Sequence, residues 1–289
     1  PPRALAQRAT LCKVLHQTPP AAMAASTKQA PCKWDATEVL LKISYERKER
    51  PMLHTWRRGY LQAFTCFPRL HVITYANKIE WVQKVLQLVP NVTFRANDYP
   101  SLIERAGRYF MIQWHLTWAD NFTTAPHLLF FDVDAVPILP LRCHHLFDDQ
   151  SRARWYSWLW LRIPSPWVRP CTRIFFRAHE LGERFRRNVS VLAPHGTQVA
   201  QHEHAGDFPT IEMMTLFPIV VPRRVLPEMR RLVSLAHGTY FDQAFVKMRH
   251  PSHADLIGKT ALLQFPELIN RTHCPSLSNK TRAHVELGS

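Results

Sequence analysis

Apolar and polar positions change their spacing along the middle of the chain, and this change predicts alternating strands and helices. Short apolar runs predict strands at residues 71–75, 92–95 and 127–131, and the first of these is rich in β-branched residues. Between them, apolar residues recur at helical spacing over residues 79–88 and 101–118. The resulting β-α-β-α-β order predicts an α/β fold with a mixed, mostly parallel sheet flanked by helices.

The pattern also sets the expected limits of the folded region. Further strands are expected at residues 154–161, 172–177 and 217–221, and further helices at 37–44, 223–235, 241–248 and 254–263. Residues 1–51 are rich in Ala, Pro, Lys and Gln and are expected to form an irregular lead-in or stem. We therefore expect a single domain over residues 52–265 and a polar tail over residues 266–289.

Composition excludes several classes of protein. The 289 residues are 46% hydrophobic and include nine Trp, which is typical of a folded globular protein and not of a disordered one. Eight Gly stand against 23 Pro, and neither the Walker spacing nor the Rossmann glycine fingerprint occurs. A phosphate site built on a glycine-rich loop is therefore not expected.

The net charge of +15 comes mainly from arginine, with 27 Arg and 10 Lys in the sequence. Because the guanidinium group binds phosphate through two parallel hydrogen bonds, an anionic ligand is one explanation for this excess. A generally basic surface is the other explanation, and composition does not separate them.

Asparagine indicates the compartment. Five of the seven Asn begin an N-x-[ST] acceptor sequence: Asn91, Asn121, Asn188, Asn270 and Asn279. Chance predicts about one such match, so this excess favours the secretory pathway, with the Golgi or ER lumen as the expected location. The six Cys include no CxxC pair, so a structural zinc site is not expected, whereas disulfides are compatible with the even number.

The chain has no apolar stretch approaching the ~20 residues that cross a bilayer. It also begins at Pro1 with no apolar signal-peptide core. We therefore expect this sequence to be a fragment, with any membrane anchor lying upstream of it.

The most informative motif follows the apolar strand at residues 127–131, where Asp132 and Asp134 are separated by one Val. In open α/β sheets, ligands bind at the carboxyl ends of the strands. Where the chain turns, two carboxylates with this spacing can approach one divalent cation. Hard oxygen ligands suit Mn²⁺ or Mg²⁺, which keep positions open for a diphosphate.

This segment resembles the DxD element of GT-A fold glycosyltransferases, enzymes that use nucleotide-sugar donors. The resemblance covers residues 70–140 and, with less detail, the chain to residue 265. It implies that Asp132 and Asp134 bind the metal of the donor diphosphate, and that the domain transfers a hexose or pentose to a glycan, protein or lipid acceptor. It also implies a histidine late in the chain as a further metal ligand, for which His253, or His250, is the candidate.

An inverting reaction would also need a base for the acceptor hydroxyl. Asp207 is the first candidate because it lies in a polar loop before an apolar stretch, and this loop is expected to line the same cavity as the aspartate pair. Asp255 is the second candidate for a catalytic acid, and Asp242 is a further one. A retaining reaction without an enzymic base stays open.

Two other functions fit parts of the sequence. The motif Asp-x-Asp-x-Val also resembles the nucleophile motif of haloacid-dehalogenase-like phosphatases, with Asp132 as nucleophile and Asp134 as general acid. That chemistry needs a lysine, and none lies between Asp134 and Lys247. A basic nucleic-acid-binding protein would explain the charge, but no motif of that class is present and the acceptor sequences argue against a nuclear location. We therefore expect no nucleic-acid partner.

Overall fold

The structure is a computed structural model, and it describes residues 36–43, 49–64, 67–137, 140–160, 210–213, 217–248 and 250–273. These residues belong to one unit that spans Lys33–His273. In the described part of the chain, no helix is long and apolar enough to cross a membrane.

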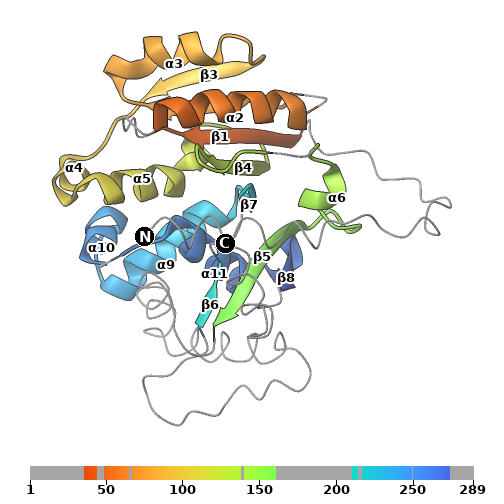
Figure 1. Cartoon of the computed structure of the whole chain (residues 1–289). Helices are drawn as coiled ribbons and strands as arrows, with labels where there is room; N and C mark the ends of the chain where they lie inside the picture. The colour runs from red at the N-terminus through yellow and green to blue at the C-terminus, as the bar shows by residue number, and fades with distance from the viewer. Residues whose placement is uncertain are drawn as a thin grey trace, which may run out of the picture. The chain divides into compact units, whose positions relative to one another are not determined.

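A five-stranded sheet forms the centre of this unit, in the order β3-β2-β1-β4-β7 (Figure 1). The strands are β1 (Thr37–Lys42), β2 (Leu70–Thr74), β3 (Val92–Ala96), β4 (His127–Asp132) and β7 (Ile219–Pro222). Strands β1 to β4 run parallel, and β7 pairs antiparallel with β4. The predicted mixed, mostly parallel sheet is confirmed.

Helices cover both faces of this sheet, with α2 and α3 on one face and α5, α9 and α11 on the other (Figure 1). The helices are α2 (Glu49–Ala63), α3 (Ile79–Leu86), α4 (Ser101–Ala106), α5 (Arg108–Thr117), α6 (Cys143–Leu146), α9 (Val225–His237), α10 (Phe241–Lys247) and α11 (His253–Gln264), with single turns η4 (Ala76–Lys78), η5 (Ala119–Asn121) and η6 (Pro266–Leu268). Successive side chains of β4 point to opposite faces. Phe131 therefore packs edge-on against Trp56 of α2, while the ring of Phe130 lies 6.1 Å from that of His253 on α11.

A smaller sheet has the order β6-β5-β8 and is built from β5 (Ala153–Trp160), β6 (Thr210–Glu212) and β8 (Ile269–His273). Strand β5 pairs antiparallel with β6 and parallel with β8. Just after β6, the carbonyl of Met213 accepts a hydrogen bond from Trp155 Nε1 at 2.8 Å. This bond ties the smaller sheet to the chain that leads into β7.

The structure corrects four expectations about elements and domain limits. The helix predicted at residues 37–44 is wrong, because this segment forms β1, the strand at the centre of the large sheet. The boundary at residue 52 therefore falls inside the folded unit, as does the boundary at residue 265, since β8 pairs with β5 beyond it. The helix predicted over 101–118 is interrupted at Gly107, whose φ of 96° ends α4 and begins α5. The strand predicted at 172–177 lies outside the described residues.

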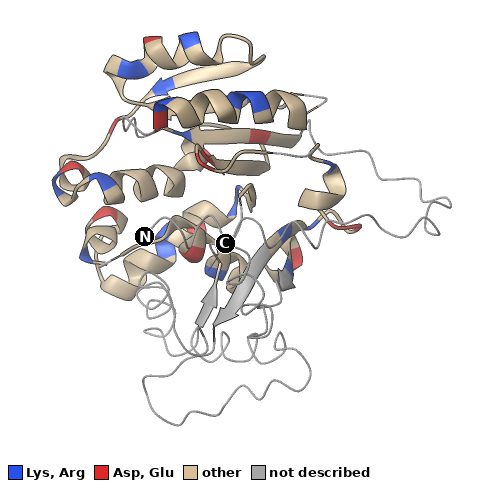
Figure 2. Ribbon diagram, in the orientation of Figure 1, with Lys and Arg blue, Asp and Glu red and all other residues tan. Residues whose placement is uncertain are grey.

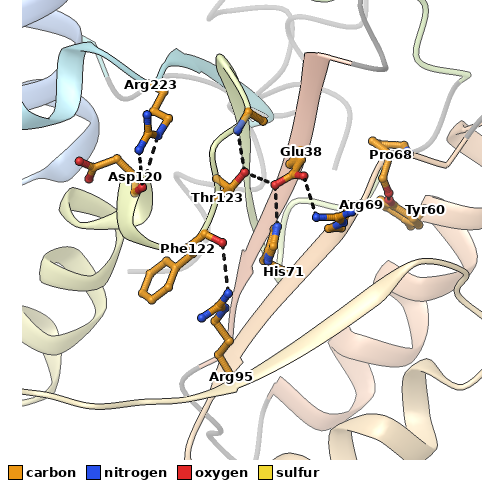
Figure 3. Close-up of polar contacts among 11 residues, drawn as sticks. Glu38, Tyr60, Pro68, Arg69, His71, Arg95, Asp120, Phe122, Thr123 and Arg223 are labelled. Carbon is orange, nitrogen blue, oxygen red and sulfur yellow. Dashed lines mark hydrogen bonds and ion pairs between the residues drawn. The ribbon is translucent and has the colours of Figure 1, made fainter.

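Basic residues are distributed over several helices and are interleaved with acidic ones in the described part of the chain (Figure 2). At the amino ends of the parallel strands, one carboxylate joins three elements (Figure 3). Glu38 of β1 accepts a short hydrogen bond from Thr123, and its Oε2 lies 2.8 Å from His71 Nε2 of β2. Its other oxygen lies 3.4 Å from Arg69 Nη1. This network fixes the amino edge of the sheet.

A second buried network holds η5 against α9. Arg230 donates two hydrogen bonds of 2.7 Å to the carboxylate of Asp120, and its guanidinium carbon lies 4.0 Å from the centre of the Trp118 ring. Arg223 donates to the backbone carbonyl of Asp120 at 3.2 and 3.3 Å (Figure 3). The connection into β4 is thus anchored by two arginines that lie more than a hundred residues further along the chain.

Candidate functional site

The carboxyl ends of β1 and β4 form the point where the strand order reverses. From β1 the chain proceeds outward through β2 and β3, and it then returns to place β4 on the other side of β1. In open parallel sheets, ligands bind outside the carboxyl ends of the strands at such a reversal. Lys42 and Asp132 are the last residues of these two strands and are paired directly across them. The topology therefore makes Lys42, Asp132 and their neighbours the candidate ligand site.

Asp132 and Asp134 lie where β4 ends and the chain turns. The backbone N–H of Ala135 donates to the carbonyl of Asp132 at 3.0 Å, which closes the turn immediately after the strand. Asp132 is partly buried, and Asp134 is exposed. The sequence motif thus lies at the carboxyl edge of the sheet, directly after the apolar strand β4.

The electrostatics of the aspartate pair are unfavourable without a cation. The pKa of Asp132 is raised to about 7, mainly by burial and further by the nearby carboxylates of Asp134 and Glu49. Within the described residues, no Lys or Arg forms an ion pair with Asp132 or Asp134. Two neighbouring carboxylates with no cationic partner are a poor arrangement for stability and a suitable one for binding a cation.

Helix α2 supports the turn through a close backbone approach. A Cβ atom at Gly59 would lie 2.4 Å from the carbonyl oxygen of Pro137 and 2.8 Å from a methyl group of Val136. Glycine is therefore required where α2 passes the segment that follows the aspartates. The backbone N–H of Leu141 also donates to the carbonyl of Ala63, at 2.8 Å, at the end of the same helix. Both contacts limit the positions that the turn can take.

Charged side chains from β1, α2 and α5 interact with one another at this edge of the sheet, and one of them, Glu49, also interacts with Asp132. Lys42 is only 4% exposed. Its pKa is lowered to about 7, mainly by burial and also by Arg108, while Glu49 acts in the opposite direction. Glu49, at the start of α2, accepts from Arg108 at 3.5 Å. The edge therefore contains both the carboxylates that a divalent cation needs and the cationic groups that attract an anionic ligand.

The two aspartates fit a metal that shares its coordination with a ligand. Mg²⁺ and Mn²⁺ are commonly held by one or two carboxylates, with phosphate oxygens and water completing the set. Within the described residues, no three His, Cys, Asp or Glu side chains gather closely enough to hold an ion by themselves. The pair suits a metal whose remaining ligands come from a diphosphate and water. It does not suit a structural site in which the protein supplies every ligand.

The structure does not assemble the predicted three-ligand set with His253. This residue is 1% exposed, and its Nδ1 and backbone nitrogen lie 2.6 and 2.9 Å from Oε1 of Gln113. Burial lowers the pKa of His253 to about 3, so the ring is neutral. Its ring lies beside Phe130, two residues before Asp132. His253 is held in the layer beneath the aspartates because Gln113 and Phe130 fix it there. His250 is exposed.

The three candidates for a catalytic acid or base, Asp207, Asp242 and Asp255, do not share one environment. Asp255 is fully buried, where its Oδ1 accepts from the backbone N–H of Met213 at 2.7 Å and lies 3.4 Å from Lys259 Nζ. This carboxylate anchors the segment after β6, so its catalytic role stays a prediction. Asp242 accepts from Trp114 Nε1 at 2.7 Å. Asp207, with the loop predicted to line the same cavity, lies outside the described residues.

Sequence reasoning missed Lys42 and the residues that follow the neighbouring strands. The signal was present, because Lys42 ends an apolar run, Val39–Leu41, just as Asp132 ends the apolar run of β4. Reading residues 37–44 as a helix concealed this equivalence. Tyr75 and Asn97 directly follow β2 and β3 and would have been identified by the same rule.

Comparison with known proteins gives structural likeness alone. No family model and no curated protein sequence matches the chain. Among solved structures, it is similar to mouse xyloside xylosyltransferase 1 in its apo form, at 12% identity and a TM-score of 0.43, over 86% of this chain and 90% of that one. It is also similar to glucosyl-3-phosphoglycerate synthase from Mycobacterium tuberculosis in complex with Mn²⁺, UDP and glucosyl-3-phosphoglycerate, at 12% identity and 0.40, over 86% and 74%. A third is 4-diphosphocytidyl-2C-methyl-D-erythritol synthase from Anaerococcus prevotii, at 7% identity and 0.40, over 89% and 98%.

Proposed function

We propose that this chain is a metal-dependent glycosyltransferase that moves a hexose or pentose from a nucleotide-diphosphate donor to a glycan, protein or lipid acceptor. The observation that carries the proposal is the aspartate pair at the strand-order reversal. Asp132 and Asp134 lie at the carboxyl end of β4, and no Lys or Arg pairs with them in the described part of the chain. Such a pair supports binding of Mn²⁺ or Mg²⁺ together with a diphosphate.

The proposed reaction assigns a limited task to each group. The acceptor oxygen bonds to the anomeric carbon of the sugar, the bond from that carbon to the diphosphate breaks, and the acceptor proton leaves. A bound Mn²⁺ or Mg²⁺ would stabilise the negative charge that develops on the diphosphate. Asp132 and Asp134 would hold that ion at the sheet edge, and Gly59 allows α2 to support their turn. Asp207 is the proposed base for an inverting reaction.

We further propose that the chain works in the lumen of the Golgi or ER. Cys143, the one cysteine among the described residues, is disulfide-bonded, which suits an oxidising compartment. Asn91 and Asn121, two of the acceptor asparagines, are exposed. Expression in a eukaryotic secretory system should yield a product whose mass falls after endoglycosidase treatment. An unchanged mass, together with six free thiols, would argue for the cytosol.

The alternatives receive less support. A haloacid-dehalogenase-like phosphatase usually carries its aspartates after the first strand of the sheet, whereas β1, β2 and β3 all precede β4 here. Lys259 is fully buried and paired with Asp255, which leaves no exposed site for a phosphate at that lysine. For a nucleic-acid-binding protein, basic residues would gather on one face, yet in the described part of the chain they are interleaved with acidic ones (Figure 2).

Thermal denaturation tests the proposal. The melting temperature of the full chain should rise with a UDP- or GDP-sugar in the presence of Mn²⁺ and stay unchanged when EDTA replaces the metal, because a ligand stabilises the state that binds it. Asp132→Asn and Asp134→Asn should each abolish the rise. Asp98→Asn is the matched control, since Asp98 is an exposed aspartate after β3 at the same sheet edge. Stabilisation that persists in EDTA, or that survives in Asp134→Asn, would argue against the proposal.

A further inference from the structure

Three of the five acceptor asparagines, Asn91, Asn121 and Asn270, lie in the described part of the chain, and the fold exposes them to different degrees. Asn91 is exposed in the turn between α3 and β3. Its φ of 56° is left-handed, a conformation that asparagine adopts more readily than most residues do. Its Nδ2 donates to the carbonyl of Phe67 at 3.3 Å on the surface. That bond uses one of the two N–H groups of the amide, and an N-linked sugar replaces the hydrogen of the other.

The acceptor sequence that begins at Asn91 is also accessible at its third position, where a Ser or Thr is required. Thr93 is the second residue of β3 and is partly exposed. In contrast, Thr123 holds the third position after Asn121, is 8% exposed and donates its hydroxyl to Glu38. Folding therefore closes the acceptor sequence at Asn121 and leaves the one at Asn91 open.

At Asn270 the asparagine side chain itself is enclosed. Its Nδ2 donates to Oδ2 of Asp148 at 2.8 Å, and the Asp148 side chain is only 7% exposed and also pairs with Arg152. The backbone of Asn270 is paired with that of Arg154 in the smaller sheet. A sugar chain on Nδ2 would have to displace this contact. The folded chain is therefore incompatible with a glycan at Asn270.

Asn91 lies at the start of the open edge of the large sheet. Strand β3 is the terminal strand and, in the described part of the chain, pairs with β2 alone (Figure 1). The backbone N–H of Asn97 donates to the carbonyl of Thr74 at 2.7 Å. Because N–H groups alternate along a strand, the N–H of Ala96 points away from β2, and Ala96 is exposed. Unpaired backbone groups along such an edge can pair with a strand of another molecule.

We infer that Asn91 carries an N-linked glycan that covers the open edge of β3, an inference that rests on the proposed location in the secretory pathway. A glycan is bulky and hydrated, and Asn91 directly precedes β3, so the sugars lie where another strand would pair. Edge strands are commonly protected by charged side chains or proline, and β3 contains one charged residue, Arg95, and no proline. The glycan completes a protection that the strand's own side chains provide only in part.

A glycan at Asn91 would not obstruct the proposed metal site. Asn91 precedes the amino end of β3, whereas Asp132 ends β4 at the carboxyl edge of the sheet. The length of β3 alone, five residues at about 3.3 Å each, separates the two edges by roughly 16 Å. Strands β2 and β1 also lie between β3 and β4. Removing the glycan should therefore leave the binding of Mn²⁺ and nucleotide unchanged.

Glycopeptide mass spectrometry of the full chain, secreted from mammalian cells, tests the assignment of the site. Asn91 should be occupied in most molecules, Asn121 in fewer, and Asn270 in almost none. Thr93→Val should abolish the glycan while leaving Asn91 in place, since valine keeps the β-branched shape that suits a strand. Thr93→Ser is the matched control, because it retains the acceptor sequence and should retain the glycan.

Sedimentation velocity tests the role of the glycan. The sedimentation coefficient of Thr93→Val should increase with protein concentration, because the uncovered edge pairs with a second molecule, whereas the parent chain and Thr93→Ser should show no such increase. Asn91→Gln removes the glycan without changing β3 and should behave as Thr93→Val does. Adding Ala96→Pro to Thr93→Val should reverse the association, because proline removes an N–H that points away from β2.

A glycan at Asn270 with none at Asn91 would overturn the inference and leave the secretory location intact. The same holds if Thr93→Val and Asn91→Gln both sediment as the parent chain does at every concentration. Absence of sugar from all five acceptor asparagines would overturn the inference and the location together. None of these results bears on the aspartate pair, which the Mn²⁺-dependent rise in melting temperature tests separately.

Discussion

Glu38 and Asp132 lie at opposite ends of adjacent strands, and their carboxylates are in opposite environments. Burial raises the pKa of Glu38, but the hydrogen bonds from Thr123 and His71 and the charges of His71 and Arg69 together outweigh burial, and the pKa is lowered overall. At the other end, burial and the neighbouring carboxylate of Asp134 together raise the pKa of Asp132 to about 7. The amino edge is thus electrostatically satisfied (Figure 3), whereas the carboxyl edge is not.

This difference separates residues that hold the fold from residues available for function. Charges that stabilise a protein are paired within it, as Asp120 is with Arg230. At the carboxyl edge, two carboxylates and a buried lysine form no ion pair within the part of the chain that the structure describes. Such an edge is retained at a cost in stability and is characteristic of ligand binding. Substitution of a paired charge and substitution of an unpaired charge should therefore affect stability and ligand binding differently.

The largest effect on stability is expected at the paired side. Arg230→Met should lower the free energy of unfolding by about 3–5 kcal/mol, because it leaves the buried carboxylate of Asp120 without its cation. The matched control is Arg231→Met at the next position, where the arginine is 56% exposed and pairs with Glu228, and a loss below about 1 kcal/mol is expected. Urea denaturation measures both values.

Donor binding adds a second measurement to this test. Where enough Arg230→Met protein remains folded, its affinity for Mn²⁺ and nucleotide should match that of the parent chain, because Arg230 lies at η5 and α9 and not at the carboxyl edge. Equal losses of stability in the two arginine variants would show that the buried ion pair contributes no more to stability than the exposed one. The distinction drawn between the two edges of the sheet would then be wrong.

The next effect is expected where the fold supports the site. Gly59→Ala should cost about 1–3 kcal/mol, since the new methyl group meets the carbonyl oxygen of Pro137 at 2.4 Å, and the overlap outweighs the better helix propensity of alanine. Moving Pro137 also moves the turn, so binding of Mn²⁺ should weaken. Arg58→Ala is the control, because Arg58 is the exposed neighbour on α2. Unchanged stability in Gly59→Ala would show that the turn adapts easily.

Sequence reasoning predicted the elements that have local signals. The apolar run of β4, buried at four of its six positions, identified both the strand and the aspartates that follow it. Strand β1 was missed because a six-residue run between charged residues fits a buried helix as well as a strand, and its place in the sheet depends on pairing with β2 and β4. Long-range partners leave no local signal, which is why the ion pair of Asp120 with Arg230 and the hydrogen bond from Lys42 to Asn97 were not anticipated.

The smallest effect is expected at Asp132 and depends on pH. The pKa of its carboxyl is about 7 in the folded chain, above the ordinary value of 3.8, so the folded state binds a proton more tightly than the unfolded state does. Stability is therefore lost as pH rises from about 4 to 7, and the loss is complete above 7.

The variant Asp132→Asn removes this titration, because its amide does not bind a proton in this pH range. With EDTA present, the variant should equal the parent chain near pH 4 and exceed it at pH 8, as measured by urea denaturation. The pKa difference alone corresponds to about 4 kcal/mol. Because this carboxyl is partly exposed and solvent screens it, the expected gain is on the order of 1 kcal/mol. Adding Mn²⁺ should reverse the order, because only the parent chain gains from binding. Asp98→Asn, at an exposed position, should show no dependence on pH in this comparison. If Asp132→Asn were less stable than the parent chain at pH 8 without metal, Asp132 would belong with the paired residues that hold the fold.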